Sequence, residues 1–301
     1  MSTLTTHTTA TRATPSGSNI GLCKFNTTSN AIEVSDGTSW LVYDPDTATG
    51  WSGSNTYSLN FDGTDDYLTA SPVTPTAQQG TISAWVKTSS DGSIFCWGSS
   101  ASYPTAQGTF RTDLRISGGK LQYFYQQQHS GSVVHGVTGN TTINDNTWHH
   151  VAVTSSGSAW SLYVDGSPET LTVSYGSNSG NWVGDLYAVS SSLLDFCDIG
   201  ALRRASNIGG SSFYGGNIDE VAVWDSALSS SQITNIYKGE INGGSGGTNG
   251  TPGNLLSFNP KAWWRMGDGL EANSGTTIYD MSIFSNNMTM VSSPAYQSDT
   301  P

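Results

Sequence analysis

Short segments in which polar and apolar residues alternate recur along the whole chain. In residues 58–62, Leu59 and Phe61 alternate with polar residues, which predicts a strand with one dry face and one wet face. Residues 81–87 and 160–164 repeat the pattern. Clusters of Gly, Ser, Asn and Asp separate such segments, so we expect many short strands rather than helices.

Two turn dipeptides indicate how the strands connect. Asp62-Gly63 and Asp165-Gly166 each follow an alternating segment, and Asp-Gly is typical of tight hairpins between antiparallel strands. Regular short strands with frequent turns favour an all-β fold, a two-sheet antiparallel sandwich. The length of 301 residues is enough to bury a substantial core.

Five segments follow one another in an order that carries a family resemblance: Tyr57-Ser-Leu-Asn-Phe-Asp-Gly-Thr-Asp-Asp-Tyr67, Thr81-Ile-Ser-Ala-Trp-Val-Lys87, Thr147-Trp-His-His-Val-Ala-Val153, Trp160-Ser-Leu-Tyr-Val-Asp-Gly166 and Gly216-Asn-Ile-Asp-Glu-Val-Ala-Val-Trp224. Together they resemble the laminin G-like branch of the concanavalin A-like lectin/glucanase superfamily, over residues 55–240. The resemblance implies a jelly-roll sandwich. It leaves function open, because this fold hosts lectins, hydrolases and inert scaffolds.

The charge balance argues against several partners. The chain has 23 Asp and Glu residues against 11 Lys and Arg, and the basic residues form no cluster. We therefore expect no nucleic-acid partner and no attraction to an anionic membrane. No apolar run approaches the length of a membrane span, so we expect no membrane insertion.

The cysteines and the N-terminus indicate where the chain folds. Cys23, Cys96 and Cys197 are widely spaced, which fits neither a disulfide framework nor a zinc site. Cys96 and Cys197 lie in apolar segments, so we expect buried free thiols. The N-terminus shows no secretory signal pattern, and synthesis in a reducing host cytoplasm is expected.

The N-terminal part differs from the rest. Residues 1–17 are rich in Thr and Ser, and we expect an extended attachment arm. Residues 18–54 hold three short strand-like segments with Asn, Asp and Gly turns, which predicts a small β module. The module resembles one that recurs in bacteriophage virion proteins of tails, fibres and capsid surfaces. Within the sandwich, residues 229–237 are expected to form one short helix capped by Ser229 or Ser230.

The C-terminal part begins with a linker. Residues 241–253 are Gly-rich and flexible by composition, and residues 254–301 contain Ala262-Trp-Trp-Arg-Met-Gly-Asp268. Similar Trp-rich strands open the sandwich in laminin G-like proteins, whereas this one follows it. We expect a strand segment that completes its own sandwich or a neighbour's, with folding back preferred.

Enzyme activity is not expected. Glycanases of this fold use a Glu-x-Asp-x-Glu strand, which puts the acid and the nucleophile on one face. None of the five glutamates begins that pattern: Glu33, Glu169, Glu220, Glu240 and Glu271.

A structural calcium ion is the expected cofactor. The resemblance implies that Asp219, in Ile218-Asp-Glu-Val221, contributes a ligand, and calcium prefers such hard oxygen atoms. Asp62 and Asp65 belong to a second acidic loop that is a further metal candidate. The alternative for both places is a carboxylate that accepts backbone hydrogen bonds in a turn.

Aromatic residues in loops are candidates for stacking on a sugar. We single out Tyr103, Tyr175, Trp182 and Tyr214 because they lie outside the clearest strands. The alternative is ordinary packing at the rim of the sandwich.

These features predict a phage virion structural protein on the virion surface. Capsid decoration or cement is the first choice, and a tail fibre or other appendage is the second. The partners expected are other virion proteins, further copies of the chain, with a trimer favoured, and host surface glycans. The alternative from another class is a free carbohydrate-binding lectin.

Overall fold

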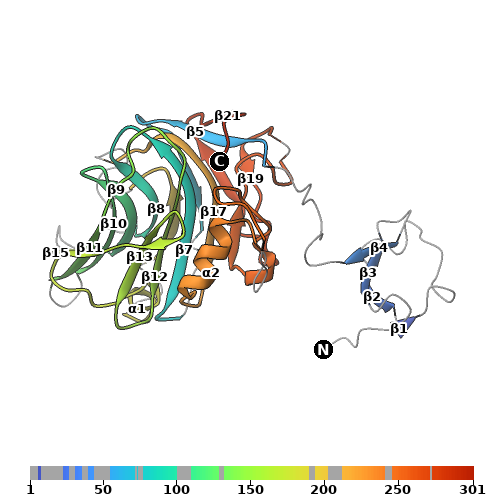
Figure 1. The fold of residues 1–301 in the computed structure, drawn as a ribbon, viewed down its shortest axis with the longest axis horizontal. Helices are drawn as coiled ribbons and strands as arrows, with labels where there is room; N and C mark the ends of the chain where they lie inside the picture. The colour runs from blue at the N-terminus through green and yellow to red at the C-terminus, as the bar shows by residue number, and fades with distance from the viewer. Residues whose placement is uncertain are drawn as a thin grey trace. The chain divides into compact units, whose positions relative to one another are not determined.

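The structure is a computed structural model (Figure 1), and its contacts divide the chain into two units, Met1–Gly53 and Ser54–Pro301. The structure describes four short strands of the first unit. In the second unit it describes residues 55–71, 73, 77–99, 110–128, 132–189, 194–202, 212–240, 246–271 and 273–301.

The first unit contains one four-stranded sheet in the order β1-β2-β3-β4. Its strands are β1 (Thr6–His7), β2 (Cys23–Asn26), β3 (Ala31–Ser35) and β4 (Trp40–Tyr43). Strands β2, β3 and β4 pair antiparallel, and β1 pairs parallel to β2. Three of these strands lie where the sequence predicts a small β module. The remainder of the predicted arm lies outside the described residues.

The second unit is a sandwich of two sheets (Figure 1). The nine-stranded sheet has the order β15-β11-β10-β9-β8-β16-β6-β20-β19. Its strands are β6 (Tyr67–Ala70), β8 (Gly92–Gly98), β9 (Arg111–Ser117), β10 (Lys120–Gln128), β11 (Ser132–Thr142), β15 (Thr172–Tyr175), β16 (Phe196–Ile199), β19 (Thr277–Ile278) and β20 (Met288–Val291). The neighbouring strands of this sheet pair antiparallel.

The eight-stranded sheet has the order β14-β13-β12-β7-β17-β5-β21, with β18 paired to β17. Its strands are β5 (Ser58–Asp62), β7 (Gly80–Thr88), β12 (His149–Ser155), β13 (Trp160–Val164), β14 (Ser167–Pro168), β17 (Gly215–Trp224), β18 (Ala262–Trp264) and β21 (Ala295–Gln297). Two antiparallel sheets with few helices confirm the predicted all-β sandwich.

The core lies between the inner faces of the two sheets. On β7, Ile82, Ala84 and Val86 all point into it, as the period-two pattern predicts. Leu114 and Ile116 of β9 belong to the same cluster from the opposite sheet. The residues that alternate with them on β9 therefore face away from the core, which positions the candidate site described below.

Within the described residues, two short α-helices and one 3₁₀-helix accompany the sheets: α1 (Val183–Val189), α2 (Ser230–Tyr237) and η3 (Leu256–Phe258). Helix α2 is the predicted helix, and Ser229 caps it by accepting a hydrogen bond from the backbone of Gln232. Its Tyr237 stacks on Trp85 of β7, with ring centroids 5.7 Å apart. The helix therefore covers the outer face of the eight-stranded sheet at β7.

The C-terminal segment pairs with strands of its own chain. Strand β18 pairs with β17, β20 pairs with β6, and β21 pairs with β5. Ala262, Trp264 and Met266 enter the core together, so the Trp-rich strand has the face pattern that alternation predicts.

Cys96 and Cys197 are buried thiols that are not part of a disulfide, as expected from their apolar surroundings in the sequence. The side chain of Cys23 lies outside the described residues. None of the helices in the described part of the chain has the length and apolar character to cross a bilayer.

Candidate functional site

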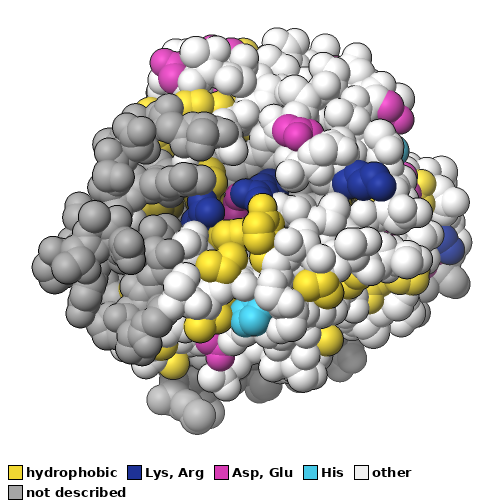
Figure 2. Space-filling view, turned by 90° about the vertical axis from the view of Figure 1, so that its left-hand side faces the viewer, with side chains coloured by type: hydrophobic (Ala, Val, Ile, Leu, Met, Phe, Trp, Pro, Cys, Tyr) yellow, Lys and Arg dark blue, Asp and Glu magenta, His cyan; other side chains and the backbone are white. Residues whose placement is uncertain are grey.

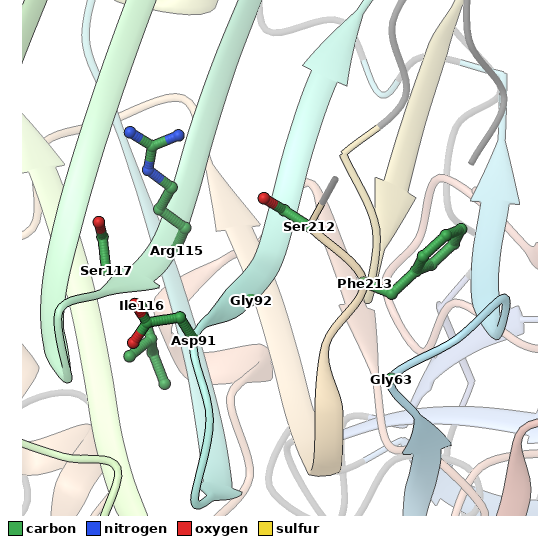
Figure 3. Close-up of a pocket in the computed structure, with 8 residues that line it drawn as sticks. All are labelled: Gly63, Asp91, Gly92, Arg115, Ile116, Ser117, Ser212 and Phe213. Carbon is green, nitrogen blue, oxygen red and sulfur yellow. The ribbon is translucent and has the colours of Figure 1, made fainter. Parts of the chain in front are cut away.

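A pocket of about 480 Å³ opens between the start of β8, the end of β9 and the segment that leads into β17 (Figure 3). Asp91, Arg115 and Ser117 stand on one side, and Ser212 and Phe213 stand on the other. Its remaining lining consists of Gly63, Gly92 and Ile116. A volume of this size accommodates a small polar ligand.

Glycines let three backbone segments converge at this pocket. A Cβ atom on Gly92 would lie 2.7 Å from the Cα atom of Tyr214, closer than packing permits. Gly63 has φ +75°, and a Cβ there would lie 3.3 Å from the Cα of Gly215. The pocket therefore depends on the absence of side chains at Gly63 and Gly92.

Arg115 is the basic group of the pocket. It points outward because its neighbours on β9, Leu114 and Ile116, are in the core. Its Nε atom donates to Gln122 Oε1 at 2.7 Å, and Nη1 donates to Asp113 Oδ2 at 3.3 Å. A guanidinium carries five N–H donors, so these contacts fix its plane and leave donors for a ligand.

Asp91 is the acidic group of the pocket. Its carboxylate accepts hydrogen bonds from the backbone N–H groups of Gly118 and Gly119, at 2.6 and 2.9 Å. These bonds hold the turn between β9 and β10, beside the Ser117 hydroxyl. A carboxylate has about four acceptor positions, so Asp91 keeps capacity to accept from a ligand hydroxyl.

A row of polar side chains continues from the pocket across the outer face of the nine-stranded sheet. Ser93 Oγ donates to Asp113 Oδ1 at 2.6 Å, and Asp113 holds the guanidinium of Arg115. On the far side of that guanidinium, Gln122 Nε2 donates to Thr138 Oγ1 at 2.7 Å and to Ser174 Oγ at 3.3 Å. In Figure 2, basic and hydrophobic side chains lie next to each other on this face.

Among the four aromatic candidates, Tyr175 is a surface residue with 45% of its area exposed. Strands β11 and β15 shift register here, because Gly136 pairs with Tyr175 while Val137 pairs with Val173. This bulge puts Tyr175 on the outer face, where its ring packs edge-on against Phe124, with centroids 5.3 Å apart. Tyr175 therefore presents an accessible ring.

Two other aromatic candidates were wrong as surface platforms, because Trp182 and Tyr214 are each 0% exposed. Trp182 enters the core just before α1 and stacks on Tyr123, with centroids 5.4 Å apart. Tyr214 packs edge-on against Phe61, and its hydroxyl donates to the carbonyl of Asn217. Tyr103 lies outside the described residues.

Asp219, the principal calcium candidate, is buried on β17. Its carboxylate accepts from Asn55 Nδ2 and from the backbone N–H of Glu220, both at 2.8 Å. Burial, followed by the charge of Glu220, raises the pKa of Asp219 well above its usual range. The arrangement therefore places an acidic group in the interior without a matching cation among the described ion pairs.

The surroundings of Asp219 fit a small oxygen-seeking cation. Asn55 Oδ1 is buried and accepts no hydrogen bond within the described part of the chain. Glu220, the next residue, has φ +49°, and the pairing of β17 with β7 shifts at this point. Such a non-glycine conformation is unusual and often marks a functional position. Asp219 and Asn55 would hold a calcium ion through their side-chain oxygens.

The second acidic loop is explained by turn chemistry. Carboxylate oxygens of Asp62, Asp65 and Asp66 lie within 4.8 Å of one another. Asp62 Oδ1 accepts from the backbone of Thr64 and Asp65, at 2.7 and 3.2 Å. The Thr64 N–H contributes most to lowering the pKa of Asp62. The loop's own backbone thus stabilises the Asp62 carboxylate, and no ion is needed to account for it.

The sequence did not single out the pocket residues. One signal was present: Arg111, Asp113 and Arg115 alternate on one strand, in a chain with only 11 basic residues. Charged side chains on one face of a buried strand indicate a functional surface. Ser212 and Phe213 line the same pocket as Arg115 but are distant from it in the sequence, so no local pattern could predict that they lie together.

Comparisons with known proteins place the sandwich in a family. Residues 62–234 match the family model described as the concanavalin A-like lectin/glucanases superfamily. A rat protein named "Sushi, von Willebrand factor type A, EGF and pentraxin domain-containing protein 1" is 25% identical over 194 residues. The match covers 60% of this chain and 5% of that protein, so the chain spans a small part of that relative's length.

Solved structures give distant matches. A structure from Bacteroides ovatus is 18% identical, with TM-score 0.47, and the match covers 80% of this chain and 59% of the Bacteroides chain. The heptameric SAP-like pentraxin of Limulus polyphemus is 22% identical, with TM-score 0.42, and the match covers 60% of this chain and 82% of the pentraxin chain. The Ruminococcus gnavus IT-sialidase CBM40 is 14% identical, with TM-score 0.46, and the match covers 60% of this chain and 97% of the CBM40 chain. Because the family model matches more than half of the chain, this protein belongs to the laminin G-like branch of the concanavalin A-like lectin/glucanase superfamily.

Proposed function

We propose that the protein is a carbohydrate-binding module that holds a sugar in the Arg115–Asp91 pocket. The observation that supports this is the chemistry of the lining. Arg115 offers N–H donors, Asp91 offers carboxylate acceptors, and Ser117 and Ser212 offer hydroxyls. The hydroxyls of a sugar both donate and accept hydrogen bonds, so a sugar can use all four groups.

We propose binding without hydrolysis. Glycoside hydrolysis uses two carboxyl groups that flank the scissile bond. Asp91 is the one carboxylate among the described lining residues of the pocket, and it is bonded to a backbone turn. The family model itself includes both lectins and glucanases by description, so the choice rests on these side chains.

A blocking substitution tests the pocket. Ser117→Trp fills the space beside Arg115, and Ser167→Trp places the same side chain on the exposed strand β14 of the other sheet. A glycan array identifies ligands of the unmodified protein, and isothermal titration measures their affinity. We expect Ser117→Trp to abolish binding and Ser167→Trp to preserve it. Equal binding by both variants rules out this pocket, and an array with no ligand rules out the function.

We propose a structural calcium ion at Asp219 as part of the same module. The buried acceptor Asn55 Oδ1 and the buried carboxylate of Asp219 support it, since a divalent cation would satisfy both groups. The ion would stabilise the middle of β17 and would not touch the sugar. Thermal unfolding with calcium and with a chelator tests this point.

We propose that the module acts on the surface of a phage virion, as capsid decoration or, as the second choice, as a tail fibre. The support is the separate N-terminal unit, whose small sheet includes strand β1 from the Thr- and Ser-rich segment. Its partners would be other virion proteins and further copies of the chain, as a trimer, after synthesis in the host cytoplasm.

Mass spectrometry of purified virions and light scattering of the isolated protein test this location. We expect the protein in virions, loss of incorporation when residues 1–17 are deleted, and a trimer in solution. Absence from virions would favour the alternative, a free lectin.

A further inference from the structure

We infer that the ligand is an extended oligosaccharide that runs from the Arg115–Asp91 pocket across the strands of the nine-stranded sheet and ends on the ring of Tyr175. This inference rests on the proposed sugar binding and adds the class of ligand, a glycan chain rather than a single sugar. It follows from three features of the outer face: a bulge, an aromatic and cationic stack, and a continuous polar row.

The bulge between β11 and β15 aims two side chains at the same surface. Gly136 pairs with Tyr175 and Val137 with Val173, so Ser174 is the extra residue of the bulge. Ser174 Oγ accepts from Gln122 on the outer face, as described above. Val173 lies opposite the core residue Val137. Without the bulge, Tyr175 would share the face of Val173 and point away from the polar row.

A stack of side chains supports the Tyr175 ring from the pocket side. Phe124 of β10 lies edge-on to it, at 5.3 Å and 86°. The guanidinium carbons of Arg111 and Arg115 lie 4.5 and 5.0 Å from the centroid of Phe124. These contacts hold the two arginines over the ring and connect Tyr175 to the pocket through two residues.

Gly136 makes room for the Tyr175 ring. A Cβ atom at this position would lie 3.0 Å from Tyr175 Cδ2 and 3.2 Å from the carbonyl oxygen of Tyr123. The missing side chain lets the ring approach the sheet while 45% of its area stays exposed. An aromatic ring that is supported from below and open above is suited to stacking on a flat ligand.

The distance across the sheet sets the length of the ligand. Arg115 lies on β9 and Tyr175 on β15, and the sheet order places β10 and β11 between them. Three strand spacings amount to about 14 Å, more than one sugar ring spans. The buried amide of Gln122 accepts from Arg115 and donates to Thr138 and Ser174 along this path, so the hydroxyls of Thr138 and Ser174 are the polar groups present for the intermediate sugar units.

The test compares two exposed residues of one strand. Tyr175→Ala removes the ring from the outer face, and Val173→Ala is the matched control, because Val173 is 50% exposed and faces the other side. Tyr175→Trp retains a stacking surface. Isothermal titration of each variant uses malto-, cello-, manno- and chito-oligosaccharides from one to six units, beside any ladder that the glycan array indicates.

We expect affinity to rise with chain length for the unmodified protein. Tyr175→Ala should reduce affinity for the longest chains about tenfold, the magnitude of one aromatic contact, and leave the monosaccharide affinity unchanged. Tyr175→Trp and Val173→Ala should retain the length dependence. Affinity that is independent of length, or equal losses in Tyr175→Ala and Val173→Ala, overturns the extended path while the pocket stands. No binding by any sugar overturns the proposed function itself.

Discussion

Arg265 Nε donates to Glu220 Oε1 across 3.0 Å, and neither side chain is appreciably exposed to solvent. This ion pair ties the C-terminal segment to β17, because Arg265 follows β18 directly and Glu220 lies within β17. Trp263 Nε1 donates to the other carboxylate oxygen of Glu220. A buried charge that keeps its partner and its hydrogen bonds is tolerated, whereas the same charge without its partner is costly.

Removal of one partner of this pair should destabilise the sandwich. Arg265→Met leaves the Glu220 carboxylate buried without its cation, and we expect a loss of about 3–5 kcal/mol in the free energy of unfolding. Urea unfolding measures the loss. Lys261→Met is the control, because Lys261 pairs with Asp225 at the surface, where such a pair contributes about 0–1 kcal/mol. Equal effects of the two substitutions would contradict the importance of burial.

Replacement of Trp264, in the core, should lower the free energy of unfolding more than replacement of Phe284, at the surface of the same C-terminal segment. Trp264 is fully buried, lies 6.3 Å from Phe95 between centroids, and donates from Nε1 to the carbonyl of Asn286. Trp264→Ala should cost about 3–5 kcal/mol of stability. Phe284→Ala, in the same segment but 45% exposed, should cost far less. If a protein without residues 254–301 melts like the full chain, the segment does not stabilise the sandwich.

Calcium should stabilise the protein through Asp219 and not through the exposed acidic loop. A ligand that binds only the folded state adds about 2.7 kcal/mol at a hundredfold excess over its dissociation constant. We therefore expect calcium to raise the melting temperature of the unmodified protein and of Asp62→Asn, which keeps the buried site. Asp219→Asn should melt at one temperature with calcium or chelator. A response lost in Asp62→Asn but kept in Asp219→Asn would move the site to the exposed loop.

Two adjacent histidines should give opposite pH dependences. The hydrogen bond to Asp165 raises the pKa of His149, which lies 2.8 Å from that carboxylate. Its stabilising contribution is complete below the unfolded pKa of about 6.5 and disappears as the pH rises through the higher folded pKa. His150 is fully buried against Trp85, and burial lowers its pKa to about 4. As the pH is lowered, the imidazole of His150 takes up its proton in the unfolded chain before it does so in the folded protein. The free energy of unfolding therefore decreases as the pH falls from about 6.5 to 4.

The two contributions can be separated by substitution. His150→Phe keeps a ring beside Trp85 and removes the proton site, so it should abolish the loss at low pH, which amounts to about 3 kcal/mol. His149→Gln should remove the decline above pH 6.5 and leave the acid limb unchanged. Urea unfolding from pH 4 to pH 9 measures both limbs. An acid limb that persists in His150→Phe would assign it to carboxylates instead.

The pocket should close when its glycine gains a side chain. Gly92→Ala places a Cβ atom 2.7 Å from the Cα of Tyr214, so the backbone that carries Ser212 and Phe213 must move. We expect a cost of about 1–3 kcal/mol and loss of sugar binding. Gly118→Asn is the control, since a Cβ atom added at Gly118 would have nothing within 4 Å and Asn tolerates its φ of +61°. A variant Gly92→Ala that binds with unchanged affinity would show that the pocket is not the site.

The local sequence determined the strands and their faces. Alternation in residues 81–87 and 262–266 predicted which side chains share a face, and both sets, Ile82, Ala84 and Val86 and Ala262, Trp264 and Met266, lie together in the core. The helix at 230–237 with its Ser229 cap was predictable for the same reason. Each of these properties depends on neighbours within a few residues, so each can be predicted from a short segment of the sequence.

Only the tertiary structure decided which residues form the site. Trp182, Tyr214 and Tyr175 all lie next to loop-like sequence, yet two are buried in the core and one is 45% exposed. The exposure of Tyr175 depends on the bulge between β15 and β11. The pocket is lined by Asp91, Arg115 and Phe213, which come from separate parts of the sequence. Exposure and convergence are set by the pairing of strands that are distant in sequence, and no local pattern encodes that pairing.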